Sequence, residues 1–90
     1  MGREQAGRRP VVVISDARLS GLGLAIIVPL TTTDRGWDIH VPVRVNRQRS
    51  IAMCEQIRSV SLDRLTGHLG VISYQELMDI RATTRSLIGF

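Results

Sequence analysis

Two runs of apolar, mostly β-branched residues near the start of the chain constrain the fold more than any other feature. Val11–Ser15 is bounded by Pro10 and Asp16, and Leu24–Thr32 follows after a glycine-containing connection. Continuous runs of this length and type are typical of strands that are buried on both faces. Pro29 lies inside the second run, which predicts an edge strand or a bulge, because proline removes one donor from the ladder.

Further strands are predicted in the middle of the chain. Asp38–Val45 alternates between polar and apolar residues, which is typical of a half-buried strand with four inward side chains, Ile39, Val41, Val43 and Val45. His40 belongs to the outward set and is expected in solvent. A polar turn at Asn46–Arg49 then leads to a strand at Ser50–Cys54, which is expected to continue after a bend through Ile57–Val60.

One helix is predicted at the end of the chain. Ser73 and Glu76 have the spacing of a capping box, and Gly89 is suited to end the helix. Six residues follow helical spacing on one face: Tyr74, Leu77, Ile80, Thr84, Leu87 and Ile88. Short strands with a terminal helix predict one mainly β, α+β domain over residues 1–90, a small and strongly curved sheet or barrel with the helix packed against it.

Composition limits the function classes. All 12 basic residues are arginine and the formal net charge is +4, which permits nucleic-acid binding, although genome base composition can also replace lysine by arginine. Aromatic residues make up only 3% of the chain, so platforms for base stacking are scarce. Cys54 is a lone cysteine within an apolar stretch and is interpreted as a core residue rather than a nucleophile. The apolar run Leu24–Leu30 is too short to span a bilayer, and a cytoplasmic protein without membrane attachment is expected.

No metal site or cofactor motif is found in the sequence. His40 and His68 are far apart, and neither has a ligating partner at a suitable spacing. Gly21 and Gly23 lack the third glycine of a dinucleotide fingerprint, and no nucleophile elbow is present. The chain is therefore expected to act without a metal or cofactor.

Two polar segments are the best candidates for chemistry. Gly2–Pro10 is a polar, glycine-flanked loop that carries Arg9 to the start of a buried strand, although Arg8 and Arg9 also fit a simple solvated basic pair. Thr31–Thr33 ends the next strand, where hydroxyls can bind phosphate oxygens, but threonine is also a common strand residue. Antiparallel pairing of the two strands would bring Arg9 close to Thr31.

These segments resemble the MazF/PemK-type toxins. The motif Gly-x-Glu-Gln-x-Gly-x-Arg-Pro before an apolar strand is present as Gly2, Glu4, Gln5, Gly7, Arg9 and Pro10. The similarity continues in order through Ala25–Thr31, Glu55–Ser59, Leu65–Ser73 and the terminal helix. The resemblance implies a strongly twisted antiparallel β-barrel of the SH3-like type, shared with CcdB, and a homodimer.

The resemblance also implies a chemistry. Family members cleave single-stranded RNA without a metal, by attack of the 2′-hydroxyl to give a 2′,3′-cyclic phosphate. Arg9 would then stabilise charge on the phosphorane and could help to transfer a proton, Thr31 would bind the phosphate, and Glu4 would act as a base or orient Arg9. RNA contacts are expected from Gln5, Arg8, Thr32, Gln56 and Arg58. Gln56 would read a base edge, but a buried amide bound to the backbone is an open alternative.

Partners follow from the same resemblance. A cognate antitoxin is expected to neutralise the toxin, and DNA contact is expected only through that antitoxin. The chain departs from the family at its beginning, because members have a strand before the loop in which Met1 stands here. A start assigned too far downstream, a truncated gene and a functional short form all fit. The alternative functions are an inactive protein that binds antitoxin, a gyrase-targeting relative, and a basic barrel that binds RNA without cutting.

Overall fold

The computed structural model describes residues 2–4, for which only the backbone is placed, and residues 9–89. Its strands are β1 (Gly2–Glu4), β2 (Pro10–Val13), β3 (Leu24–Thr31), β4 (His40–Val45), β5 (Gln48–Met53), β6 (Arg58–Ser61) and β7 (Leu65–Gly67). The helices are α1 (Ala17–Ser20) and α2 (Tyr74–Leu87), with 3-10 turns η2 (Cys54–Gln56) and η3 (Leu62–Arg64). Part of the expected loop Gly2–Pro10 is therefore strand, since Gly2–Glu4 and Pro10 belong to β1 and β2.

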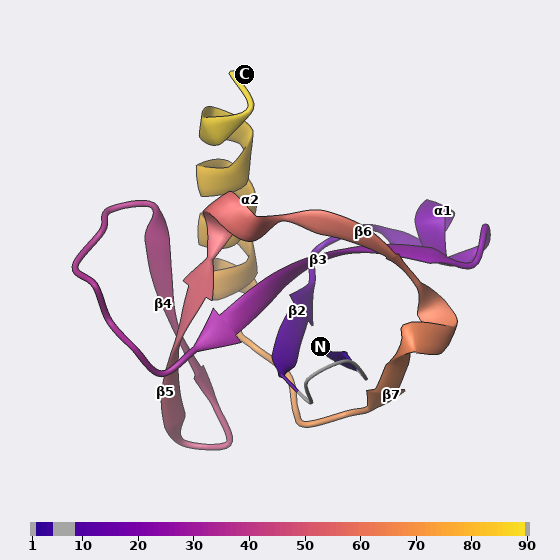
Figure 1. Cartoon of the computed structure of the whole chain (residues 1–90), viewed down its shortest axis with the longest axis horizontal. Helices are drawn as coiled ribbons and strands as arrows, with labels where there is room; N and C mark the ends of the chain where they lie inside the picture. Colours follow the sequence, from indigo (N-terminus) through magenta and orange to yellow (C-terminus); the bar gives the residue numbers. More distant parts are fainter. Residues whose placement is uncertain (1, 5–8, 90) are drawn as a thin grey trace.

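The strands form one strongly curved antiparallel sheet. Neighbours pair in the order β4-β5-β3-β2-β1-β7, and β6 pairs with β3 beside this path. Figure 1 shows β6 and β7 curving around the side of β2, with α2 standing behind the sheet. The predicted antiparallel β fold with a C-terminal helix is confirmed. Within residues 2–4 and 9–89 the paired order does not return to its start, so the sheet stays open.

The expectation that Pro29 marks an edge or bulge is wrong. β3 lies at the centre of the sheet, and Pro29 is buried opposite Val11 of β2. On its other side, β3 pairs with β6 only as far as Ile27 and with β5 only from Leu30 onward. Pro29 therefore lies where one ladder has ended and the next has not begun, so its missing N–H costs little.

Both faces of the β2–β3 pair are buried, as their continuous apolar sequences predict. Val12, Val28 and Leu30 belong to a core cluster that includes Ile80 of α2. Val11, Ala25 and Ile27 point into a second cluster, which is covered by Val60, Leu62 and Leu65 of the β6–β7 segment. This double burial fixes the ends of β2 and β3 rigidly in space.

The β4–β5 hairpin follows the predicted alternation only in part. Val41, Val43 and Val45 are buried as expected, and Asn46 and Arg47 form the turn with positive φ angles of 52° and 69°. The prediction for His40 is wrong, because this residue is buried and only 7% exposed. Its outward position on β4 is covered by neighbouring segments instead of water.

The C-terminal helix begins as predicted. The Ser73 hydroxyl accepts a hydrogen bond from the Glu76 N–H at 3.0 Å, and the Glu76 carboxylate accepts from the Ser73 N–H at 2.8 Å. The same carboxylate accepts the Arg44 N–H at 2.7 Å, which joins α2 to β4. Ile80 and Thr84 are buried as expected, whereas three residues of the predicted apolar face are exposed: Tyr74, Leu87 and Ile88. Figure 1 shows that the end of α2 projects beyond the sheet.

Candidate functional site

A cavity of about 520 Å³ lies where several strand ends meet, and we call it the Arg9 pocket. Arg9 directly precedes β2 and is exposed, and Thr31 is the last residue of β3 and is half-buried. Val11 of β2 pairs with Pro29 of β3, so two further steps of the antiparallel ladder set Arg9 opposite Thr31. Both residues line the pocket, as the pairing of their strands predicts.

The loop between β3 and β4 forms another wall of the Arg9 pocket. It contributes Thr33, Arg35 and Trp37. The Thr33 N–H donates to the Thr31 hydroxyl at 3.2 Å, which fixes the loop to the end of β3. The Arg35 guanidinium carbon lies 5.6 Å from the centre of the Trp37 ring, within the range of a cation–π contact. Trp37 is 48% exposed, so an aromatic surface faces the solvent at this site.

A buried histidine and a carboxylate complete the Arg9 pocket. His40 Nε2 lies 3.0 and 3.1 Å from the two carboxylate oxygens of Glu55. The His40 ring also packs against Trp37, with 4.8 Å between ring centres and an angle of 42°. Glu55 and Gln56 belong to η2, whose first residue, Cys54, is fully buried and anchors the turn in the core.

The environment keeps Glu55 ionised. Burial raises the pKa of this carboxyl, but the hydrogen bond from His40 and other contacts outweigh it, so the pKa falls below its ordinary value. Gln56 is exposed, and its amide donates to the Met53 sulfur at 3.7 Å. The alternative of a buried amide bound to the backbone is therefore wrong for Gln56.

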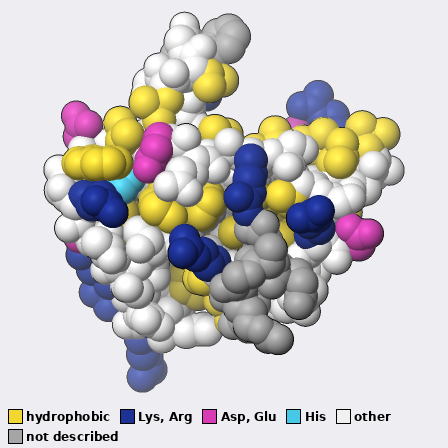
Figure 2. Space-filling view, in the orientation of Figure 1, with side chains coloured by type: hydrophobic (Ala, Val, Ile, Leu, Met, Phe, Trp, Pro, Cys, Tyr) yellow, Lys and Arg dark blue, Asp and Glu magenta, His cyan; other side chains and the backbone are white. Residues whose placement is uncertain are grey.

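The Arg9 pocket combines the donors and acceptors that a nucleotide requires. Arg9 and Arg35 supply cationic N–H groups, and Thr31 supplies a hydroxyl, all of which are phosphate-binding groups. Glu55 and Gln56 supply polar atoms suited to a base edge. Figure 2 shows basic side chains spread across this face of the molecule, with acidic groups fewer and scattered between them. The arrangement is suited to an anionic chain that also carries polar bases.

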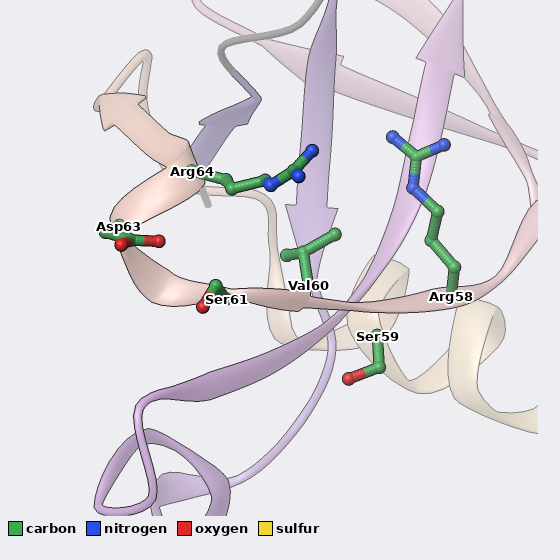
Figure 3. Close-up of a pocket in the computed structure, with 6 residues that line it drawn as sticks. All are labelled: Arg58, Ser59, Val60, Ser61, Asp63 and Arg64. Carbon is green, nitrogen blue, oxygen red and sulfur yellow. The ribbon is translucent and has the colours of Figure 1, made fainter.

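A second cavity of about 720 Å³ lies along β6 and η3, and we call it the Arg58 cavity. Its lining comes entirely from the segment between Arg58 and Arg64. In Figure 3, Arg58, Val60 and Arg64 lie on one side of the ribbon, and Ser59 and Ser61 lie on the other. The Arg58 cavity offers the cations Arg58 and Arg64, serine hydroxyls and the exposed carboxylate of Asp63, and its described lining residues include neither an aromatic ring nor a buried polar side chain.

The site residues that the sequence predicts do not all lie in one cavity. Arg9, Thr31 and Gln56 line one pocket, Arg58 lines the other cavity, and Thr32 is exposed and lines neither. The predictions for Gln5 and Arg8 lie outside the described residues. For Glu4 the backbone is described in β1, but the side chain is not.

Five residues that line the pocket are not predicted as site residues from the sequence: Arg35, Trp37, His40, Met53 and Glu55. An exposed tryptophan in a polar, glycine-containing loop is a signal that could have identified Trp37. Glu55 lies beside Gln56 in a segment that carried the family resemblance. No local signal identifies His40, because its burial depends in part on Glu55, which lies fifteen residues away.

Other groups in the described residues have simpler explanations. Burial raises the pKa of the Cys54 thiol to about 11, as expected for an unreactive core cysteine. Within residues 9–89, no group of three or more His, Cys, Asp or Glu side chains is arranged to hold a metal ion. No helix in the described parts of the chain is long and apolar enough to cross a membrane.

Comparison with known sequences gives consistent results. The family model of PemK-like, MazF-like toxins of type II toxin-antitoxin systems matches residues 1–88. The endoribonuclease toxin MazF of Escherichia coli is 32% identical over 90 residues, which covers 98% of this chain and 81% of the relative. The probable endoribonuclease MazF5 of Mycobacterium tuberculosis is 38% identical over 82 residues, covering 86% of this chain and 71% of the relative.

Solved structures agree with the sequence matches. MazF from Deinococcus radiodurans superposes with a TM-score of 0.83 and 28% identity, covering 100% of this chain and 84% of the other. The MazE-MazF structure from the same organism gives a TM-score of 0.83 and 26% identity, covering 94% and 86%. An endoribonuclease from a mycobacterial species has a TM-score of 0.84 at 20% identity, over 99% of this chain and 86% of the other, which supports the fold alone.

Proposed function

We propose a function from one premise: the chain belongs to the family of PemK-like, MazF-like toxins of type II toxin-antitoxin systems. Relatives in this family are named endoribonucleases. The proposed function is sequence-specific cleavage of single-stranded mRNA, which inhibits growth of the cell. The observation that carries it is the Arg9 pocket, where a cationic donor and a hydroxyl from neighbouring strands share one cavity.

In the proposed reaction, the RNA supplies its own nucleophile. The 2′-oxygen forms a bond to phosphorus as its proton leaves, the bond from phosphorus to the 5′-oxygen breaks, and that oxygen takes up a proton. The products are a 2′,3′-cyclic phosphate and a 5′-hydroxyl end. This chemistry is assigned entirely to the RNA and the side chains, so cleavage is expected without an added metal ion.

Arg9 and Thr31 are the proposed catalytic residues. The Arg9 guanidinium stabilises negative charge that develops on the phosphate oxygens, and the Thr31 hydroxyl holds the phosphate in place. Arg9 and Thr31 lie at the ends of β2 and β3, and both faces of these strands are packed in the core. This packing supports the assignment, because it holds the two strand ends in a fixed position. Glu4 remains the proposed base or the group that orients Arg9. RNA contacts beyond the reacting phosphate are proposed for Gln5, Arg8, Thr32, Gln56 and Arg58.

Partners are proposed from the relatives. A MazE-MazF structure is among the similar structures, so we expect a cognate antitoxin to bind this chain. We also propose that the toxin acts as a homodimer in the cytoplasm and contacts DNA only through its antitoxin. Intact mass and light scattering of the toxin alone and with its antitoxin test these assemblies.

The function is tested with purified protein and single-stranded RNA in EDTA. We expect cleavage that leaves 2′,3′-cyclic phosphate and 5′-hydroxyl ends, which end-group labelling identifies. Arg9→Ala protein purified in the same way is the control for contaminating nuclease. RNA that stays intact while the protein binds antitoxin tightly would instead establish the non-catalytic alternative.

A further inference from the structure

The β4–β5 hairpin carries three exposed arginines, Arg44 on β4, Arg47 in the turn and Arg49 on β5. The strand register sets Arg44 directly opposite Arg49, and like charges in this position repel and destabilise a sheet. Arg44 Nη1 donates to the Arg47 carbonyl oxygen at 3.2 Å, which holds its guanidinium beside the turn. Figure 2 shows basic side chains over this hairpin, at the lower left. The hairpin thus gathers positive charge where local stability disfavours it.

The turn of the hairpin contains a second unfavourable arginine. Asn46 and Arg47 join the two strands with φ angles of 52° and 69°. A two-residue turn of this kind favours asparagine followed by glycine, because glycine adopts a positive φ without a steric cost. Asn46 fits this preference, whereas Arg47 does not. Backbone strain of this kind is typical of functional sites, so a side chain at position 47 is expected to have a use.

One face of the hairpin leads from these arginines to the Arg9 pocket. Side chains alternate between the two faces of a strand, and cross-strand partners share a face. The face turned away from the core carries three pairs, His40–Met53, Pro42–Ile51 and Arg44–Arg49. His40 and Met53 line the Arg9 pocket. The arginine pair lies about 13 Å further along the same face, since each residue of a strand advances about 3.3 Å.

The acidic groups beside the hairpin leave most of its charge available. The Arg49 guanidinium lies 3.5 Å from one oxygen of Asp34, and the two side chains are 55% and 45% exposed, so this ion pair is weak. The Glu76 carboxylate accepts the backbone N–H groups of Arg44 and Ser73 and is held at the start of α2. An anion can therefore replace Asp34 at Arg49 at little cost.

We propose that Arg44, Arg47 and Arg49 form a phosphate-binding surface for the part of an RNA strand that leaves the Arg9 pocket along the β4–β5 hairpin. The inference rests on the proposed RNA function and adds a place where a flank of the substrate binds. Contacts to phosphates fix the position of the strand without reading its sequence. This hairpin surface should therefore strengthen binding of long RNA, whatever its bases.

RNA fits the hairpin surface better than an acidic polypeptide does. The planar fork of donors on arginine matches a phosphate group. Phosphates follow one another about every 3.4 Å in a stacked strand and at most roughly twice as far apart in an extended one, so about two to four nucleotides span the 13 Å from the pocket. The shared face joins this surface to a pocket that is itself suited to nucleotides, and a single strand can occupy both.

The proposal is tested by binding of uncleavable RNA to the full chain. Oligonucleotides with 2′-O-methyl groups cannot supply the attacking hydroxyl, and the fluorescence of Trp37, the single tryptophan, reports on the pocket. Two pools with all four bases at every position are compared, an octanucleotide that reaches the hairpin and a dinucleotide that fills only the pocket. The double variant Arg44→Gln, Arg49→Gln should bind the octanucleotide about tenfold more weakly and lower the slope of log affinity against log salt by about 1.4, or about 0.7 for each phosphate contact.

The dinucleotide distinguishes a direct contact from a structural effect. Its affinity should change by less than about twofold in the double variant, because charges about 13 Å away are largely screened at physiological salt. Lysine at both positions keeps the charge and should retain most of the salt slope. Arg18→Gln makes a similar charge change on α1, on the opposite side of the molecule from the hairpin (Figure 1), and should leave both affinities unchanged.

Arg47→Gly separates binding from stability. It places glycine at the positive φ angle, so the urea midpoint of unfolding should rise while octanucleotide affinity falls about threefold. A variant that is more stable and yet binds long RNA less tightly cannot owe its weaker binding to damage of the fold. Unchanged octanucleotide affinity in Arg47→Gly would remove Arg47 from the surface.

The remaining outcomes decide between the hairpin surface and the proposed function. Equal losses for octanucleotide and dinucleotide, or no loss for either, would overturn the surface even if the protein cleaves RNA. A poly-glutamate peptide that binds through Arg44 and Arg49 while octanucleotide binding ignores them would also overturn it, in favour of an acidic protein partner. A protein that binds the octanucleotide through the hairpin but never cuts RNA with free 2′-hydroxyls would keep the surface and overturn the proposed catalysis.

Discussion

The Arg9 pocket and the Arg58 cavity both contain arginine and hydroxyl groups, but they are built in different ways. Residues of the Arg9 pocket come from the ends of four strands, a loop and a 3-10 turn, whereas one continuous segment lines the larger Arg58 cavity. Groups from separate, buried elements keep a fixed geometry with respect to one another. The groups of the Arg58 cavity lie along a single exposed segment, so they provide charge but are not held in place relative to one another by separate elements. We therefore propose that the smaller cavity carries out the chemistry and that the larger one binds the RNA backbone.

The largest expected effect separates the two cavities by cleavage rate. Arg9→Ala should reduce kcat/KM for RNA cleavage by about 10²–10³-fold, because it removes a preorganised donor to developing charge. Arg58→Ala should reduce the rate by less than about tenfold, since the loss of one phosphate contact weakens binding alone. Single-turnover cleavage of a labelled RNA measures both. Equal losses in the two variants would remove the distinction between the cavities.

A second prediction concerns salt. Arg58→Ala and Arg64→Ala should each weaken binding of uncleavable RNA by a similar factor for every base sequence. Each substitution should also lower the slope of log affinity against log salt by about 0.7 if the residue contacts one phosphate. Fluorescence titrations across a series of salt concentrations measure this slope. A change in base preference without a change in slope would contradict a purely backbone role.

How far the Arg9 pocket could be predicted from the sequence depends on the kind of contact involved. Apolar periodicity located β2 and β3, and antiparallel pairing then brought Arg9 and Thr31 together. His40 was assigned to solvent because alternation along β4 is a local rule, whereas its burial comes from Trp37 and from Glu55, which lies fifteen residues away. Contacts of this kind depend on loop conformation, which sequence periodicity does not determine.

The same limit appears in the fold. The capping box of Ser73 and Glu76 is a local device and was predicted correctly. The exposed positions of Leu87 and Ile88 follow from the length of α2 relative to the sheet, which helical spacing alone cannot reveal. The prediction for Pro29 is wrong for a similar reason, because the gap between two ladders is a property of the assembled sheet.

The smallest expected effect concerns stability rather than either cavity. Glu76→Ala should lower the free energy of unfolding by about 1–2 kcal/mol at pH 7, because it leaves the Ser73 and Arg44 N–H groups without their acceptor. Asp79→Ala, which loses only one exposed contact with Gln75, should cost less than about 0.5 kcal/mol. Urea unfolding followed by circular dichroism measures both changes.

Acid should reduce the difference between wild type and Glu76→Ala. Partial burial raises the pKa of Glu76, but the backbone N–H groups of Ser73 and Arg44 lower it by more, so the pKa lies below its ordinary value of 4.5. The stabilisation is therefore fully present above that ordinary value and is lost as the pH falls through the lower, folded-state pKa. A difference that stays constant down to pH 2 would show that the carboxylate is not the cause.

The most direct test of the central assignment is a crystal structure of the chain with an uncleavable 2′-O-methyl RNA. The account predicts one phosphate within hydrogen-bond distance of both the Arg9 guanidinium and the Thr31 hydroxyl, with its neighbours extending toward Arg58. An RNA bound along the Arg58 cavity with no phosphate at Arg9 and Thr31 would contradict it.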